Sequence, residues 1–362
     1  SIRIFIFQFL GNTMKNQSKT KILITLSYLI FILPFLYIGA INYTADPLWL
    51  FNYDNKYNTK QLDFDERQQK TNYLYFKSNK DFDGILLGSS RATFVDQNEF
   101  KNMNIFNYSA NAMSPIEYKD YLDFAKKVKG EDLKYIIIGL DFEGSGISKN
   151  SQFEKPNFYI DKTTTFLYRY KMLFSLDLYK KSKEQLENYK TYEKYYNREN
   201  IKFQNKVSEE ERQLRYSGTL KTHIKNLLYP NYEYNNNYIN ILKTIKNENP
   251  NSKFIIYTSA VTAGLFLATI KEADKWQEYK NWLHQSVEVF GEINHFMTIS
   301  TITKNLQNYP DDDHAYPDVL KLLANKLSNF ENKDIPKDFG VKLTKDNIDK
   351  YLEDLEKQIY SQ

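Results

Sequence analysis

The sequence predicts an α/β fold in which about five strands form a doubly wound parallel sheet. Four short apolar runs have the length of buried strands: residues 84–87, 105–107, 135–139 and 254–258. A weaker fifth run lies around residues 295–297, and helical patterns separate the runs at residues 115–128, 274–290 and 317–330. Strands that alternate with helices in this way are typical of parallel sheets covered by helices.

Three segments fall outside this alternation, so the α/β domain proper is expected over residues 81–330. Its long interruption, at about residues 150–250, carries three helical patterns: residues 168–178, 180–196 and 209–228. A structureless loop of that length is uncommon, so we expect a helical insertion over the carboxyl edge of the sheet. Residues 44–80 are expected to be a polar linker with one helix inside residues 61–79. Residues 331–362 are expected to form a C-terminal helical appendage.

An uncharged apolar segment, residues 22–41, is about as long as a bilayer is thick. The charges that flank it are Lys15, Lys19 and Lys21 on one side and Asp46 on the other. The positive-inside rule then predicts a cytoplasmic N-terminus (residues 1–21), one span over residues 22–43 and a main domain outside the cytoplasmic membrane. A cleaved signal peptide is the alternative. The run is longer than the usual apolar region of such peptides and no clear cleavage site follows, which favours an uncleaved anchor.

The composition excludes several classes of protein. Forty-nine basic residues are interleaved with 45 acidic ones, the net charge is only +4, and no basic block resembles a nucleic-acid surface. The chain has no cysteine, which excludes disulfides, thiolate metal sites and a cysteine nucleophile. We therefore expect no nucleic-acid partner, no metal and no other cofactor.

The first candidate site is the strand that runs into Gly88-Ser89-Ser90. This pattern places Ser90 at the start of the next helix, at the sheet edge where α/β folds carry their sites. There the backbone N–H groups and the helix dipole favour an anion, which suits a nucleophile whose intermediate carries a negative oxygen. A plain turn followed by a serine helix cap is the alternative explanation.

Among the four histidines, His314 fits a general base. It lies in a predicted loop three residues after Asp311, a carboxylate that could orient its imidazole. His223 and His284 lie on predicted helices in charged surroundings and are expected at the surface, whereas His295 is expected in the core. The Asp-Asp-Asp-His run would also fit a solvated turn or a metal loop, but no further ligands at regular spacing are apparent.

The order of these elements resembles that of SGNH (GDSL-type) hydrolases. The likeness is to their membrane-anchored branch, similar to the D-alanyl-lipoteichoic acid biosynthesis protein and polysaccharide O-acetylation factors. The first family block matches Gly88-Ser89-Ser90-Arg91, the second falls on residues 107–112, the third on residues 139–141, and the last matches Asp311-x-x-His314. The resemblance covers about residues 80–145 and 250–330. It implies a flavodoxin-like sheet and a triad of Ser90, His314 and Asp311.

Two positions depart from the family pattern. Ala112 stands where the family usually has glycine, and its backbone N–H can still serve an oxyanion. Asp141 stands where the hydrolases usually have an asparagine whose amide donates to the oxyanion, and an ionised aspartate would repel that oxygen. Asp141 is therefore either protonated through burial or paired with Arg91 or another cation. The positions that the resemblance assigns to the oxyanion or the substrate are Ser90, Arg91, Asn107, Ala112 and Asp141.

Together these patterns predict a bacterial membrane-anchored serine esterase or acyltransferase that acts outside the cell on acylated envelope glycans. Water as the second nucleophile would give deacylation and a sugar hydroxyl would give transfer; the sequence does not choose between them. The alternative, which Asp141 favours, is a non-catalytic SGNH-like accessory subunit. Such a subunit would bind glycan or support a membrane-bound O-acyltransferase.

Overall fold

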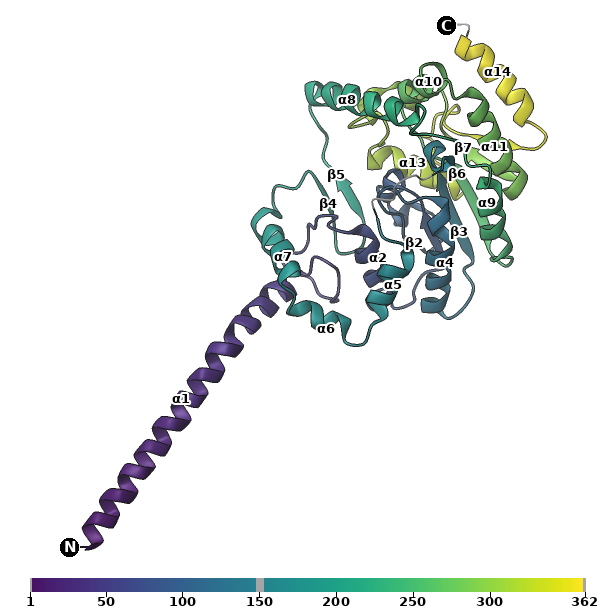
Figure 1. Ribbon diagram of the computed structural model, residues 1–362. Helices are drawn as coiled ribbons and strands as arrows, with labels where there is room; N and C mark the ends of the chain where they lie inside the picture. Colours follow the sequence, from purple (N-terminus) through teal and green to yellow (C-terminus); the bar gives the residue numbers. More distant parts are fainter. Residues whose placement is uncertain (1, 148–152, 361–362) are drawn as a thin grey trace.

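The computed structural model describes residues 2–147 and 153–360, with side chains from Thr20 onward, and confirms an α/β fold with a mostly parallel sheet (Figure 1). Within this part of the chain the sheet has six strands, in the order β2-β1-β3-β6-β7-β8. They are β1 (Gly84–Leu87), β2 (Ile105–Asn107), β3 (Tyr135–Leu140), β6 (Lys253–Thr258), β7 (Glu292–His295) and β8 (Val341–Thr344). The first five in the order pair in parallel, and β8 runs antiparallel to β7.

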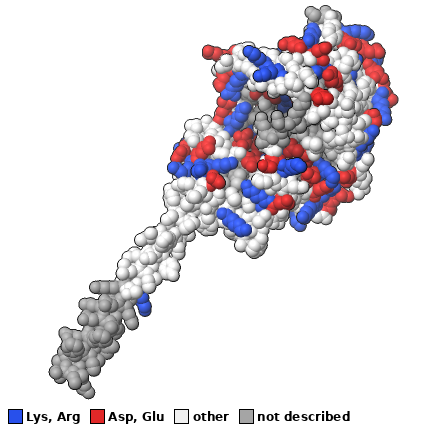
Figure 2. All heavy atoms as spheres, viewed as in Figure 1, with Lys and Arg blue, Asp and Glu red and all other residues white. Residues whose placement is uncertain are grey.

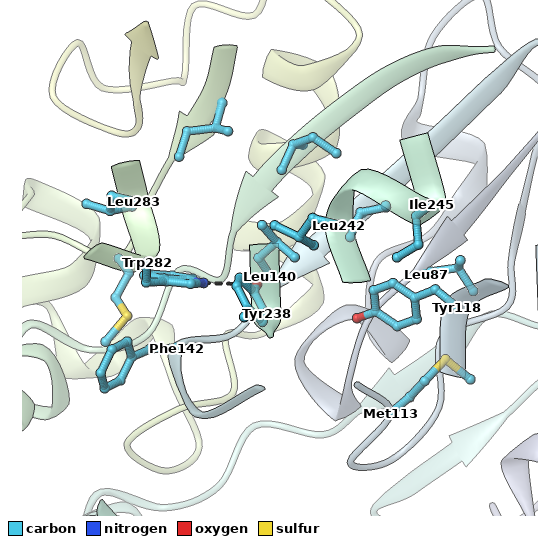
Figure 3. Packing of buried hydrophobic residues seen from close by; sticks show 14 of the residues in the cluster. Leu87, Met113, Tyr118, Leu140, Phe142, Tyr238, Leu242, Ile245, Trp282 and Leu283 are labelled. Carbon is cyan, nitrogen blue, oxygen red and sulfur yellow. Dashed lines mark hydrogen bonds between the residues drawn. The ribbon is translucent and has the colours of Figure 1, made fainter. Parts of the chain in front are cut away.

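Both faces of the sheet are covered by helices. Successive side chains of a strand point to opposite faces, so Ile136 and Ile138 enter one core and Ile137 the other. The first core packs against α4 (Pro115–Lys129), α9 (Tyr238–Asn247) and α11 (Trp276–Phe290), as Figure 3 shows around Trp282 and Tyr238. The second core packs against α13 (Pro317–Leu327). The shorter helices near the sheet are α3 (Ser90–Thr93), α10 (Ala263–Lys271) and α12 (Thr301–Lys304).

The C-terminal tail and the fifth parallel strand each differ from the prediction. It forms β8 as well as a helix, α14 (Ile348–Tyr360), so it extends the sheet and is more than a helical appendage. The apolar face of α14, which includes Leu352 and Leu355, is buried in the first core. The fifth parallel strand, β7, lies three residues earlier than the run predicted at 295–297.

The insertion contains a β-hairpin as well as helices. Its helices are α5 (Pro156–Thr164), α6 (Tyr168–Leu173), α7 (Leu176–Asn188) and α8 (Glu209–Leu227), and its strands are β4 (Lys194–Tyr196) and β5 (Lys202–Gln204). The helix predicted over residues 180–196 is therefore too long, because α7 ends at Asn188 and residues 194–196 form the first strand of the hairpin. The insertion also ends before Tyr238, since α9 packs against α4 and α11 as a connecting helix of the α/β layer.

Two helices precede the sheet. The first, α1 (Ile2–Ala45), contains an apolar stretch, Thr20–Ala45, long enough to cross a membrane, and its most apolar window is unburied in the fold. The second, α2 (Glu66–Phe76), lies inside the predicted range of 61–79 and is capped by Asp65, whose side chain accepts from Gln68 N–H. Although α2 begins with seven polar residues, all seven are buried; neighbouring segments supply hydrogen-bond partners for most of them, and the Lys70 ammonium lies over the Tyr196 ring.

Candidate active site

Ser90 is the first residue of α3, directly beyond the carboxyl end of β1. Ser89 caps this helix by accepting from Arg91 N–H at 3.3 Å. Gly88 is required by a close approach, since a Cβ at this position would lie 2.6 Å from the Ala92 Cβ. The strand, the glycine and the cap therefore fix where the Ser90 hydroxyl points. Ser89 is thus the helix cap, and the Ser90 hydroxyl is not used for capping.

His314 joins Ser90 to Asp311 in one hydrogen-bonded chain. Its Nε2 lies 2.9 Å from Ser90 Oγ, and its Nδ1 lies 3.0 Å from Asp311 Oδ2. Asp311 also accepts from the His314 backbone N–H at 2.8 Å, so one carboxylate fixes both the loop and the ring. The edge of His314 meets the Phe94 ring at a centroid distance of 6.0 Å. The structure thus brings Ser90 to His314, which is 224 positions away in the sequence, and places both in the order that serine nucleophile, base and orienting acid require.

A second carboxylate, which the sequence did not single out, also faces His314. Asp313 Oδ1 lies 2.8 Å from Nδ1, at ion-pair distance. Burial by itself lowers the pKa of His314, but the charge of Asp313 and the bonds to Asp311 and Asp313 outweigh it and raise that pKa to about 10. At neutral pH the ring is therefore an imidazolium that donates from Nε2 to Ser90 Oγ.

Arg91 is the cation that holds the acidic side of this cluster together. Its Nη1 and Nη2 donate to the two oxygens of Glu143 at 2.9 Å each, and its Nε donates to Asp313 Oδ2 at 3.0 Å. Glu143 lies in a short 3₁₀ helix after β3, Phe142–Ser145. Burial opposes the charge on Arg91, yet Glu143, Asp141 and Asp313 together raise its pKa well above the ordinary value. Because its donors are used inside the protein, Arg91 serves as a counter-ion and does not present a free guanidinium to a substrate.

Asp141 and Asn107 do not take the positions that an oxyanion role would need. Asp141 Oδ1 lies 3.2 Å from Arg91 Nη1, which matches the ion-paired alternative. Asn107 is fully buried; its amide donates to the carbonyls of Ala92 and Val95, and its oxygen accepts from Ser109. Asn107 therefore stabilises the backbone of α3 and of the turn that follows it. It does not line the cleft, because its polar atoms are used by the backbone that follows Ser90.

Ala112 adopts the left-handed conformation, with φ of +49°, in the loop where the family usually has glycine. The polar helix α2 holds this loop: Glu66 accepts from Asn111 N–H at 2.6 Å and Arg67 donates to Asn111 O at 2.7 Å. Glu66 is itself bound by Lys202 of the hairpin at 2.7 Å. Within the described residues the Ala112 and Ser90 N–H groups donate to no protein acceptor, so both are free for a ligand.

His223 is a site residue that the sequence analysis placed at the surface. It lies on α8 of the insertion, and its Nδ1 is 2.7 Å from Asp312 Oδ2 while its Nε2 is 3.7 Å from Asp313 Oδ2. Burial lowers the pKa of His223, but the hydrogen bond to Asp312 and the charges of Asp313, Asp312 and Glu143 raise it above the ordinary value. No local pattern marks His223. The one available signal was indirect, since three adjacent aspartates need cations when they are buried.

The remaining histidines behave as the sequence predicts. His295 is fully buried between Thr258 Oγ1 at 2.9 Å and Tyr279 OH at 2.7 Å, and burial lowers its pKa to about 3. His284 is at the surface, with its Nε2 3.4 Å from Asp349 Oδ1. Neither residue lines the cleft.

The triad opens into a cleft of about 570 Å³. One wall comes from the sheet edge, and the other comes from α8 and the loop that follows it. The residues that line it around the triad are Ser89, Arg91, Asn111, Ala112, Asp141, Glu143, Thr219, His223, Asn226, Tyr232 and Asp313. The mixture of hydroxyls, amides and aromatic rings is suited to a polar organic substrate.

Two groups of ligand atoms in this cluster lie close enough to hold a metal ion: His223, Asp312 and Asp313, and Asp311, Asp313 and His314. Asp313 belongs to both groups, and its Oδ2 already accepts from Arg91. A metal ion would have to compete with the guanidinium for this carboxylate. Within the described residues, Arg91, His223 and His314 are the cationic partners of these aspartates, and the contacts form a hydrogen-bonded ion network.

Comparison with known proteins gives no family: no protein-family model matches the chain, and no curated protein matches its sequence. The function must therefore be argued from the geometry.

Proposed function

We propose that this protein is a membrane-anchored serine esterase or acyltransferase with an SGNH-type, flavodoxin-like domain. The proposal rests on the hydrogen-bonded triad of Ser90, His314 and Asp311. His314 Nε2 lies 2.9 Å from Ser90 Oγ, and His314 Nδ1 lies 3.0 Å from Asp311 Oδ2. Two features support it. The five parallel strands follow the order 2-1-3-4-5 of flavodoxin-like sheets. Ser90 also stands at the carboxyl edge of that sheet, beside a cleft.

The proposed reaction is acyl transfer through Ser90. Neutral His314 takes the hydroxyl proton as Ser90 Oγ attacks the ester carbonyl, and Asp311 orients the imidazolium that forms. When the tetrahedral intermediate collapses, the bond from the acyl carbon to the alkoxy oxygen breaks. His314 then protonates the leaving alcohol. Attack on the acyl-enzyme by water or by a sugar hydroxyl, again deprotonated by His314, regenerates Ser90.

The oxyanion would be bound by backbone donors. The free N–H groups of Ser90 and Ala112 support this role, and α2 holds the second of them through Glu66 and Arg67. Asp141 adds no donor because it is paired with Arg91. The oxyanion site is therefore smaller than in hydrolases that have an asparagine at this position, which favours activated esters and slow turnover.

The apolar part of α1 supports a location for the domain beside the membrane. The most apolar 18-residue window of the Thr20–Ala45 stretch has a mean hydropathy of 2.3, and Figure 2 shows the coloured part of this helix as almost entirely uncharged. If the lysines before it stay in the cytoplasm, the domain stands outside the membrane, next to acylated envelope glycans. A membrane-bound O-acyltransferase is then a plausible donor or partner in the same membrane.

A fluorophosphonate probe tests the proposal directly. Ser90 Oγ should form a bond to phosphorus and expel fluoride, and mass spectrometry should place the adduct on the peptide that contains Ser90. The reaction should be run at pH 9 because His314 must be neutral to act as the base. Full-length wild type that forms no adduct at Ser90 at this pH would contradict an activated serine.

The pH profile should differ from that of an ordinary triad. Since the pKa of His314 is raised to about 10, the rate constant for probe labelling should rise with pH from neutrality toward pH 10. In Asp313→Asn the charge that most raises this pKa is lost, so the rise should occur at lower pH. Asp318→Asn is the matched control, because Asp318 is 82% exposed and should leave the profile unchanged. Coincident profiles for wild type and Asp313→Asn would refute this assignment.

A non-catalytic accessory subunit is the second candidate, and it is favoured by the Asp141–Arg91 pair and the protonated state of His314. Complementation of a deletion strain separates the two. If the enzyme proposal is right, Ser90→Ala and His314→Ala should fail to restore base-labile acyl groups on envelope glycans, although both variants are expressed. Full restoration by both variants would favour the accessory role.

A further inference from the structure

An exposed apolar patch lies on the insertion, at the base of the domain beside α1 (Figure 1). It is formed by large side chains on α6, on the turns that flank it and at the start of α7. Their exposed fractions are 80% for Phe166, 47% for Leu167, 52% for Tyr170, 47% for Phe174 and 62% for Leu176. Five large apolar residues exposed within eleven positions mark a contact surface, because soluble surfaces usually scatter such residues singly.

The patch is attached rigidly to the end of α1. The Phe174 ring packs on Gly39, where a Cβ would lie 3.3 Å from the ring. Asn42 is 1% exposed, and its amide donates to the carbonyls of Leu173 at 2.8 Å and Ser175 at 3.1 Å. Its oxygen accepts from Ser182 Oγ of α7 at 2.9 Å. Because Asn42 ties both α6 and α7 to the helix, the height of the patch along α1 is fixed.

That height coincides with the end of the apolar span. At about 1.5 Å per residue, residues 22–41 cover roughly 30 Å, the thickness of the hydrocarbon core. Gly39 then lies about 3 Å inside its outer boundary, and Tyr37, whose ring centroid is 6.2 Å from that of Tyr179 on α7, lies about 6 Å inside. Residues that touch α1 at these positions must themselves be at the level of the lipid.

We infer that the patch is embedded in the lipid interface of the leaflet at the C-terminal end of α1. The inference rests on the proposal that α1 spans the membrane. The side chains fit this place, since aromatic residues prefer the headgroup level and exposed Lys171 and Lys180 can extend to lipid phosphates. Exposed Asp161 and Asp177 add no attraction for anionic lipid, so burial of apolar area drives the contact. Lipid contact orients the domain, with α8 on the side away from α1 (Figure 1).

The chain has no cysteine, so a single introduced cysteine can carry an environment-sensitive fluorophore. We would label Phe166→Cys, Tyr170→Cys and Leu176→Cys in the full chain, reconstituted in phosphatidylcholine nanodiscs with nitroxide-bearing acyl chains. Leu29→Cys, 45% exposed within the span, reports whether α1 crosses the bilayer. Leu214→Cys, 74% exposed on α8, is the matched exposed control.

Emission from the three patch positions and from Leu29→Cys should be quenched, and emission from Leu214→Cys should be unaffected. Quenching at Leu29→Cys without quenching at the patch would overturn the inference and leave the patch as a surface for a protein partner. If Leu29→Cys is not quenched either, α1 does not span the bilayer, and the inference fails together with its premise. Probe labelling of Ser90 in the same samples shows separately whether the proposed chemistry stands.

Discussion

Ser90→Ala should lower the rate of ester cleavage by at least about 10³-fold, because it removes the atom that forms the acyl-enzyme. The fold should survive, since Ser90 is half-buried and its side chain bonds only to His314 among the described residues. The measurement is hydrolysis of an activated ester, such as a nitrophenyl ester, by the full chain in detergent at pH 9. At that pH more of His314 is neutral than at pH 7.

Ser89→Ala is the matched control for this experiment. Ser89 accepts from Arg91 N–H as the cap of α3, so its loss should cost roughly 1 kcal/mol of stability and preserve most of the activity. Equal loss in both variants would show that the short helix, and not the Ser90 hydroxyl, controls the rate. Full activity in Ser90→Ala would remove the acyl-enzyme mechanism and leave the accessory role.

The parallel part of the sheet was predictable because its strands are buried on both faces. Continuous apolar runs such as residues 135–139 have few alternatives, and β1, β2, β3 and β6 lie within one residue of their predicted bounds. By contrast, β8 is a four-residue strand, Val341–Thr344, that exists only because β7 offers it an edge. Local sequence carries little information about such a strand.

The hairpin in the insertion was missed for a similar reason. Residues 194–204 are rich in Tyr, Lys and Asn, and their hairpin is stabilised from outside by the bond of Lys202 to Glu66. Helix α2 was found by its spacing, but its burial was not predictable because most of its polar side chains bind distant segments. Buried polar groups require such partners, and partners distant in the chain leave no periodicity.

Within the candidate site, the residues that act were easier to predict than the residues that hold them. Ser90, His314 and Asp311 belong to short patterns with fixed spacing, and the structure brings them together. Glu143 and His223 belong to no such pattern. Glu143 pairs with Arg91 and His223 pairs with Asp312, and both contacts exist only in the folded chain.

Arg91→Met should destabilise the protein by about 3–5 kcal/mol, the largest stability effect that we expect from a single change in the cluster. Arg91 is 9% exposed and is the guanidinium shared by Glu143, Asp313 and Asp141. Methionine of similar length would leave these carboxylates together without their main counter-ion. Urea unfolding of the full chain in detergent, followed by intrinsic fluorescence at pH 7, measures the difference.

Arg215→Met provides the control, because Arg215 also binds a glutamate through two 2.8 Å contacts but on a more exposed surface. Its loss should cost less than about 1 kcal/mol.

The loss of unfolding free energy in Arg91→Met should also become smaller as the pH falls. Burial would raise the pKa of Glu143 and Asp313, but Arg91 helps to lower both, so wild type gains stability from them above their unfolded pKa values and loses it in acid. The variant lacks the share of this gain that comes from Arg91, so its deficit becomes smaller as the two carboxylates protonate. A deficit equal to that of Arg215→Met, or one that is unchanged in acid, would mean that Arg91 is not the counter-ion that holds the site together.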